Sequence, residues 1–277
     1  MTGTESLMEI LQEHLASEQL ELPVFPPLAL QLQEMLSRDD ADIAKVSARI
    51  AEDQVLASQL LRAANSAFFS GLSKVTTIRD SIMRLGSKQA INLIFLATQH
   101  QQYKSMDRSM EGYLRKLWTH ASSCATGGKW LAEKLGYSSI AQEAFLGGLF
   151  HDIGNLFLLK VLENIRKTRK GDFDLSAPIL TEVLESMHTT QGALLLQRWN
   201  IPEIYCDVVR LHHDEQINTG NTMLVIVRLV DQACHKLGIG LHHNPAIVLA
   251  ATPEAQILEV SELLAAQLEI MLEDSVG

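Results

Sequence analysis

Near the middle of the chain, the stretch of residues 144–154 reads Ala144-Phe145-Leu146-Gly147-Gly148-Leu149-Phe150-His151-Asp152-Ile153-Gly154. Its apolar run suits a buried helix and ends in two side chains of metal-ligand type, His151 and Asp152, before a glycine that relieves backbone crowding. Two interpretations are open. Either His151 is a core histidine held by its neighbour, or both side chains face a metal ion. The second interpretation requires further histidines and aspartates on other helices.

The composition limits the classes of protein to which this stretch can belong. A chain of 277 residues suffices for one large domain or two packed subdomains. The net charge of −10 disfavours non-specific binding to nucleic acid. Cys124, Cys206 and Cys234 form no Cys-x-x-Cys pair and indicate reduced thiols. The N-terminus lacks the basic and apolar regions of a signal peptide, and the most apolar windows are too short to span a bilayer. We therefore expect a cytoplasmic protein with no membrane partner.

Apolar residues recur at helical spacing along the whole chain, and no hairpin dipeptide separates alternating runs, so the sequence predicts an all-α fold. We expect a capping box at Ser6 and Glu9 and a helix start at Pro26. A polar stretch after Gln99 marks a seam between an N-terminal helical subdomain, residues 1–105, and a second helical subdomain, residues 106–277. The last predicted helix runs from about Pro253 to Leu272 as a lid on the core.

Ligand-type side chains recur in the second half, at the inner ends or apolar faces of the expected helices. His120 lies among apolar positions of a long helix, and Asp231 lies within an apolar run where a lone carboxylate would be costly to bury. The candidate metal ligands are His120, His151, Asp152, His188, His212, His213 and Asp231. We expect the remaining histidines of this half, His235, His242 and His243, at the surface.

Imidazole and carboxylate suit divalent transition ions, namely Fe, Mn, Ni, Co or Zn. We expect one or two such ions. One ion cannot accept seven ligands and keep a position open for water or substrate, and an Asp152 that bridges two ions would use the ligands better. Such a pair of ions would promote attack of water on a phosphoester, with Asp152 as the catalytic residue. His188 could equally be a hydrogen-bonded helix residue, and His212 or His213 could belong to a solvated face.

The order His120, His151-Asp152, Asp231 resembles the HD superfamily of metal-dependent phosphohydrolases. His188 and His212-His213 resemble the additional ligands of its bimetallic HD-GYP branch. In the first half, residues 22–26, 53–56, 65–67 and 81–86 resemble the signatures of the HDOD family, the HD-related output domain. The resemblance covers roughly residues 20 to 240. It implies an HD-domain-like helical bundle preceded by an N-terminal helical subdomain.

The resemblance also implies a role in bacterial signal transduction, because HDOD proteins commonly regulate and many lack the metal ligands that this chain retains. Asn155 stands where HD-GYP enzymes carry a lysine, and residues 214–221 contain no Gly-Tyr-Pro. Two functions are open: a metal-dependent phosphohydrolase acting on a nucleotide or other phosphoester, and a non-catalytic regulatory or scaffold module whose N-terminal helices bind a signalling protein. Di-iron oxygen chemistry uses a similar helical cage but has no distinct signature here.

Overall fold

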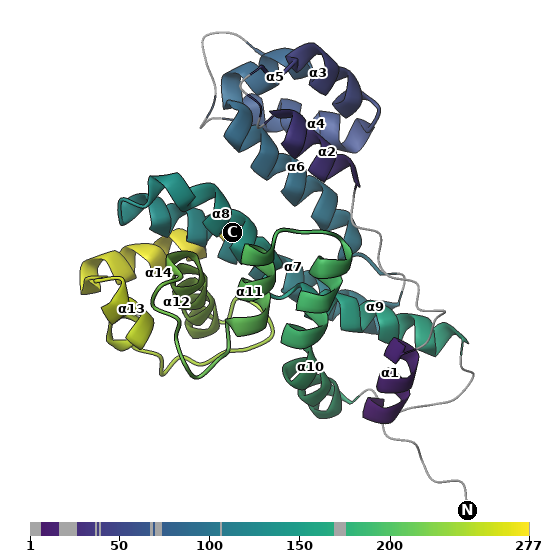
Figure 1. Ribbon diagram of the computed structural model, residues 1–277, viewed down its shortest axis with the longest axis vertical. Coiled ribbons are helices and arrows are strands. Elements are labelled where there is room, and N and C mark those ends of the chain that lie inside the picture. Colours follow the sequence, from purple (N-terminus) through teal and green to yellow (C-terminus); the bar gives the residue numbers. More distant parts are fainter. Residues whose placement is uncertain are drawn as a thin grey trace, which may run out of the picture. The chain divides into compact units, whose positions relative to one another are not determined.

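The computed structural model describes residues 7–16, 27–36, 38, 40–66, 69, 74–105, 107–168 and 176–276. These residues form helices joined by turns and loops and contain no strand, which confirms the predicted all-α class (Figure 1). The chain divides into two compact units. One unit is Val24–Gln102, and the other combines Met1–Pro23 with Tyr103–Gly277. The expected capping box at Ser6 and helix start at Pro26 lie outside the described residues.

The unit Val24–Gln102 consists of short helices around a common apolar core. They are α2 (Pro27–Leu36), α3 (Ile43–Ala51), α4 (Gln54–Ala64), α5 (Ile78–Leu85) and α6 (Ser87–Gln102). Helices α2, α4 and α5 each pack against α6, and α3 packs against both α4 and α5. Leu32, Ile50, Leu60 and Ile94 are fully buried between these helices. Burial of these leucines and isoleucines stabilises the unit through the hydrophobic effect.

Two of the short segments that resemble HDOD signatures fix the ends of α4. The carboxylate of Asp53 accepts hydrogen bonds from the backbone N–H groups of Val55 and Leu56 at 2.9 and 3.0 Å, which makes Asp53 the N-cap. At the other end, Asn65 Nδ2 donates to the carbonyl of Val75, and the N–H of Val75 donates to Asn65 Oδ1, both at 2.8 Å. This reciprocal pair ties the chain before α5 to the end of α4. The segment 22–26 and residue 67 lie outside the described residues.

The other unit is built on one long helix. Its elements are α1 (Leu7–Ala16), α7 (Arg108–Lys134), η1 (Ser138–Ile140), α8 (Ala141–Phe150), α9 (Ile153–Thr168), α10 (Ala177–Arg198), α11 (Glu203–Leu211), α12 (Thr222–Leu237), η2 (Leu249–Ala251), α13 (Pro253–Ile257) and α14 (Glu262–Val276). Helix α7 packs against α8, α9, α12 and α14. Helix α1 packs against α9, so this N-terminal helix belongs with the later elements. The expected domains, 1–105 and 106–277, stay predictions.

The prediction of one continuous C-terminal helix from about Pro253 to Leu272 is wrong, because this segment forms two helices, α13 and α14. Glu259 adopts a φ of 54°, and the N–H of Val260 donates to the carbonyl of Ala255 at 2.8 Å, a bonding pattern that ends a helix. Helix α14 packs against α7 and α12. Its Leu268 and Leu272 are fully buried, so α14 does cover part of the core.

One helical stretch, Ser138–Thr168, passes a length and composition test for a membrane span, with a mean hydropathy of 1.4 over its most apolar window. However, 89% of that window is buried inside the structure. The stretch also turns at His151 and Asp152, between α8 and α9. Its apolar side chains therefore serve the core of this unit.

Candidate metal centre

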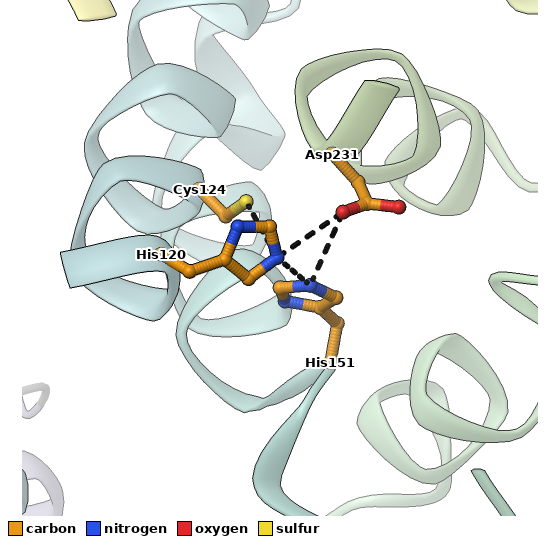
Figure 2. Close-up of side chains that lie close together, drawn as sticks. All are labelled: His120, Cys124, His151 and Asp231. Atoms are coloured by element: carbon orange, nitrogen blue, oxygen red, sulfur yellow. Dashed lines mark hydrogen bonds and ion pairs between the residues drawn. The ribbon is translucent and has the colours of Figure 1, made fainter. Parts of the chain in front are cut away.

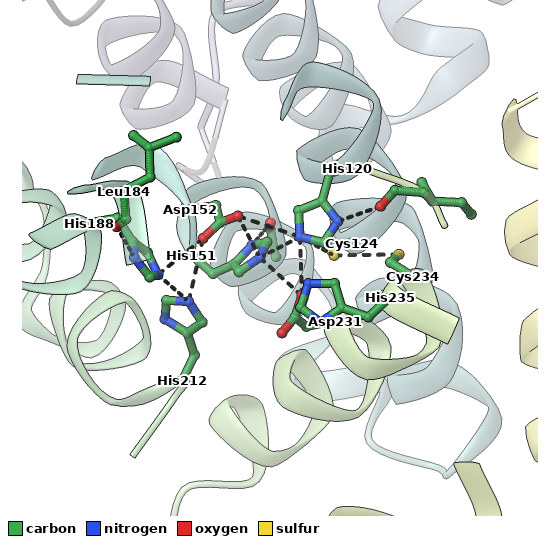
Figure 3. Close-up of polar contacts among 12 residues, drawn as sticks. His120, Cys124, His151, Asp152, Leu184, His188, His212, Asp231, Cys234 and His235 are labelled. Atoms are coloured by element: carbon green, nitrogen blue, oxygen red, sulfur yellow. Dashed lines mark hydrogen bonds and ion pairs between the residues drawn. The ribbon is translucent and has the colours of Figure 1, made fainter. Parts of the chain in front are cut away.

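The seven predicted ligands come together from separate elements of the unit that contains α7 to α14. His120 lies on α7, His151 and Asp152 form the turn between α8 and α9, His188 lies on α10, His212 and His213 follow α11, and Asp231 lies on α12. They form two groups, and Asp152 lies between them. Figure 3 labels all of these ligands except His213. We name His120, Cys124, His151 and Asp231 the buried cluster, and Asp152, His188, His212 and His213 the pocket cluster.

In the buried cluster, three ligand atoms approach one another closely (Figure 2). His120 Nε2 lies 3.1 Å from both Asp231 Oδ1 and His151 Nε2, and His151 Nε2 lies 3.8 Å from Asp231 Oδ1. Two nitrogen or oxygen ligands on one transition ion are separated by about 2.8 to 3.6 Å, given bonds of about 2.0 to 2.2 Å and bond angles between about 90° and 109°. The two separations of 3.1 Å therefore fit a common ion, and the separation of 3.8 Å is a few tenths of an ångström longer than a shared ion requires.

Asp152 joins the two clusters because each of its carboxylate oxygens faces a different one. Oδ2 lies 3.6 Å from His120 Nε2 and 3.8 Å from His151 Nε2. Oδ1 lies 3.5 Å from the Nε2 atoms of both His188 and His212, which are themselves 3.3 Å apart. This arrangement suits a carboxylate that bridges two ions.

Each of four histidine rings is oriented by a main-chain carbonyl that accepts a hydrogen bond from Nδ1–H. The pairs are His120 with Ile239 at 2.9 Å, His151 with Gly148 at 2.8 Å, His188 with Leu184 at 2.8 Å and His212 with Val209 at 2.9 Å. A neutral ring that donates through Nδ1 presents the lone pair of Nε2. The four Nε2 atoms therefore face inward, where a bound cation would satisfy them together. Burial alone would lower the pKa of His120, but Asp231 and Cys234 raise it well above its usual range, so this ring favours the protonated form until a metal cation replaces the proton.

The charges of the centre are strongly coupled. Burial alone would raise the pKa of Asp152, but His151, His212, His188 and His120 together hold it well below its usual range. Burial lowers the pKa of His151 to about 4, with the neighbouring histidines acting in the same direction. The centre thus favours ionised carboxylate and neutral imidazole at His151, the forms that bind a metal.

Two glycines allow the helices to approach closely enough to form the centre. A Cβ on Gly154 would lie 1.9 Å from the carbonyl oxygen of His188, and one on Gly148 would lie 2.3 Å from that of Cys124. No side chain can occupy either space, so these positions let α10 reach α9 and α7 reach α8. The prediction that Gly154 relieves backbone crowding agrees with this contact.

A cavity of about 580 Å³ opens beside the pocket cluster. It is lined by Tyr113, Lys116, Asp152, Asn155, Ala177, Thr181, Leu184, Glu185, His188, His213, His235, Leu241 and His242. Among the described residues, no member of the buried cluster lines this cavity. Asn155 is 6% exposed, and its Oδ1 has no hydrogen-bond partner among the described residues. An unpaired buried amide oxygen at a cavity wall is suited to a ligand.

Two residues that lie at the centre, His235 and Cys124, were not among the ligands predicted from the sequence. His235 was expected at the surface, but its Nε2 lies 3.3 Å from Asp231 Oδ1 and its ring stacks on that of His120 at 5.6 Å between centroids. Cys124 was expected only as a reduced thiol, and its Sγ lies 3.8 Å from His120 Nε2. Each follows a predicted ligand by four residues, Cys124 after His120 and His235 after Asp231. That spacing places the two residues of each pair on the same face of their helix. It is the sequence signal that could have identified Cys124 and His235 as members of the site.

A comparison with protein families matches residues 22–215 to the model of the HDOD domain. The matched range covers well over half of the chain. The chain belongs to the HDOD domain family. A curated protein that is similar in sequence, an uncharacterized protein of Treponema pallidum (strain Nichols), is 25% identical over 198 residues, which span 70% of this chain and 38% of that protein. The chain therefore corresponds to well under half the length of this relative.

Solved structures share the fold of this HDOD chain. An HDOD domain protein of unknown function from Geobacter sulfurreducens matches with a TM-score of 0.75 and 22% identity, over 97% of this chain and 95% of that one. A structure from Shewanella amazonensis SB2B named "Putative metal-dependent phosphohydrolase" matches with a TM-score of 0.69 and 19% identity, over 98% of both chains. A "Putative signal transduction protein" from Marinobacter aquaeolei VT8 matches with a TM-score of 0.67 and 20% identity, over 98% of this chain and 60% of that one. These likenesses confirm the HDOD-type helical bundle.

Proposed function

We propose that this HDOD protein is a bacterial signal-transduction output whose centre binds two divalent transition ions and hydrolyses a nucleotide or another phosphoester. The observation that carries the proposal is the placement of Asp152, with Oδ2 toward His120 and His151 and Oδ1 toward His188 and His212. A bridging carboxylate is typical of two-ion centres. The names of the Shewanella and Marinobacter neighbours point in the same direction.

The cavity beside the pocket cluster offers the contacts that a phosphoester needs. Two divalent ions in such a centre supply Lewis acidity toward phosphoester oxygens. The ammonium group of Lys116 at the cavity wall attracts the phosphate charge, and the unpaired amide oxygen of Asn155 can accept a hydrogen bond from the substrate. The volume of about 580 Å³ is in the range of small-molecule sites, so a nucleotide fits better than a large partner.

Metal analysis and turnover assays test this proposal together. We expect purified protein reconstituted with Fe, Mn, Co, Ni or Zn to hold about two ions per chain. The loaded protein should release product from at least one member of a panel of nucleotides, cyclic dinucleotides and phosphomonoesters, and Asp152→Asn should abolish that release. An ion content of about one per chain or less after reconstitution would refute the two-ion centre.

The alternative is a non-catalytic regulatory module that binds a signalling protein through the helices of Val24–Gln102. Exposed apolar side chains in that unit favour it, since Met83 on α5 is 68% exposed and Val55 on α4 is 47% exposed. The two functions predict different results for the same loaded sample. Metal binding without turnover, combined with a metal-dependent rise in the melting temperature, would support the regulatory module with a structural centre.

A further inference from the structure

Cys124 occupies a ligand position in the buried cluster that the HD-type series of histidines and aspartates does not include. It follows His120 by one helical turn on α7, and its side chain is fully buried. Its Sγ lies 3.8 Å from His120 Nε2, and the ligand atoms of Cys124, His120, His151 and Asp231 all lie within 4.8 Å of one another. Figure 2 shows the four side chains directed toward a common point.

The separation fits a shared ion. For a tetrahedral ion with bonds of about 2.3 Å to sulfur and about 2.0 to 2.1 Å to nitrogen, the sulfur and nitrogen lie about 3.6 Å apart. The observed distance of 3.8 Å differs from this by a fraction of an ångström. A small rotation of the Cys124 side chain would bring Sγ to the distance that a shared ion requires.

The surroundings of Cys124 also differ from those of a cysteine that only fills space. A buried thiol of that kind packs against apolar groups. Here Sγ faces the ring of His120, and the Cys124 thiol donates to a second sulfur, Cys234 Sγ on α12, at 3.7 Å (Figure 3). Once Cys124 is a thiolate, the direction reverses and the thiol of Cys234, or a serine hydroxyl in its place, can donate to it, which is a common outer support for metal-bound sulfur.

We propose that Cys124 is a thiolate ligand of the ion in the buried cluster, so that the two halves of the centre hold chemically unlike ions. The proposal rests on the two-ion centre proposed above. Binding forms a bond between Sγ and the ion and releases the thiol proton to solvent. Sulfur favours Zn, Fe or Co at the buried position, whereas the pocket cluster offers only nitrogen and oxygen, which also suit Mn.

Cobalt(II) reports sulfur ligation directly. The full chain, loaded with Co(II) under reducing conditions, should show a near-ultraviolet thiolate-to-cobalt charge-transfer band. The same band should appear in the double variant Cys206→Ser/Cys234→Ser, in which Cys124 is the only remaining cysteine. Cys124→Ser should lose the band. The double variant decides the question even where Cys124→Ser fails to fold.

A matched control and a metal count separate the possible failures. Cys206 is buried on α11, and its thiol donates to the carbonyl of Ile201 at 3.7 Å, so Cys206→Ser should keep the full band. Bound cobalt without the band, or a band that persists in Cys124→Ser, would overturn the thiolate ligand and leave the two-ion centre intact. Failure to bind cobalt at all would overturn both.

Discussion

The two ligand clusters share Asp152 as a neighbour but differ in exposure and in chemistry. All four members of the buried cluster are buried, and they offer sulfur as well as nitrogen and oxygen. The pocket cluster offers nitrogen and oxygen alone, and its Asp152, His188 and His213 line the cavity. The difference separates two tasks. In the proposed two-ion centre, the buried cluster would retain an ion, and the pocket cluster would present one to a ligand.

The largest effect is expected from Asp152→Ala, because this substitution removes the link between the clusters. Both clusters lose a carboxylate, and the histidines around it lose the charge that balances bound cations. We expect the ion content after reconstitution to fall from about two per chain to below one. Elemental analysis measures the content. Asp207→Ala, which alters a half-exposed aspartate on α11, is the control and should keep both ions.

Single histidine substitutions should then separate the clusters. His120→Ala removes a ligand of the buried cluster only, and His188→Ala removes one of the pocket cluster only, so each variant should retain about one ion. The retained ion should differ in accessibility, because the cavity opens on the pocket cluster. A chelator should therefore strip the ion of the His120→Ala variant faster than that of His188→Ala. Equal rates would show that the clusters do not differ in access.

The third prediction concerns the contact that places the pocket cluster. Gly154→Ala puts a Cβ 1.9 Å from the carbonyl of His188, so α10 must move. We expect the free energy of unfolding to fall by about 2 to 3 kcal/mol. Gly112→Ala is the matched control on α7, where a Cβ would meet none of the described residues within 4 Å. It should raise stability by about 0.5 to 1 kcal/mol, because alanine favours helix. Chemical denaturation measures both, and a stable Gly154→Ala would contradict the close contact.

The smallest effect is expected far from both clusters, at Glu163 on α9. Its carboxylate accepts hydrogen bonds from Lys167 and Ser105 at 2.8 Å. Burial would raise the pKa of Glu163, but these partners and Lys160 hold it below its usual range. The stabilisation is therefore present above the unfolded-state pKa and is lost as the pH falls through the folded-state value. Glu163→Gln should cost about 1 kcal/mol at pH 7. Urea denaturation should find this deficit shrinking below about pH 4, and a deficit that does not depend on pH would contradict the charge assignment.

Much of this architecture could be predicted from the sequence, because helix signals are local. The apolar periodicity and capping residues such as Thr77, whose hydroxyl accepts from the N–H of Asp80, give the helical class and many helix ends. The C-terminal break at Glu259 could not be predicted. A positive φ at a glutamate is an uncommon local conformation, and no residue there has the turn preference of glycine or asparagine.

Most residues of the candidate site could be predicted, but their grouping into two clusters could not. Buried ligand-type residues on separate helices could be recognised, since burying them without a partner is costly. Which of them share an ion depends on helix packing, and that depends on close contacts such as the one at Gly154. His235 and Cys124 were missed because each was considered alone. Their helical spacing from Asp231 and His120 carries the information.

The main-chain carbonyls that orient the histidine rings have a further consequence, for mutational robustness. The acceptors belong to Ile239, Gly148, Leu184 and Val209. A main-chain carbonyl survives any side-chain substitution that preserves the local backbone. No single replacement at Ile239, Leu184 or Val209 therefore deletes a ring's hydrogen-bond partner. Sequence drift can change these side chains while the inward lone pairs persist, so the centre is vulnerable at its ligands and glycines and tolerant elsewhere.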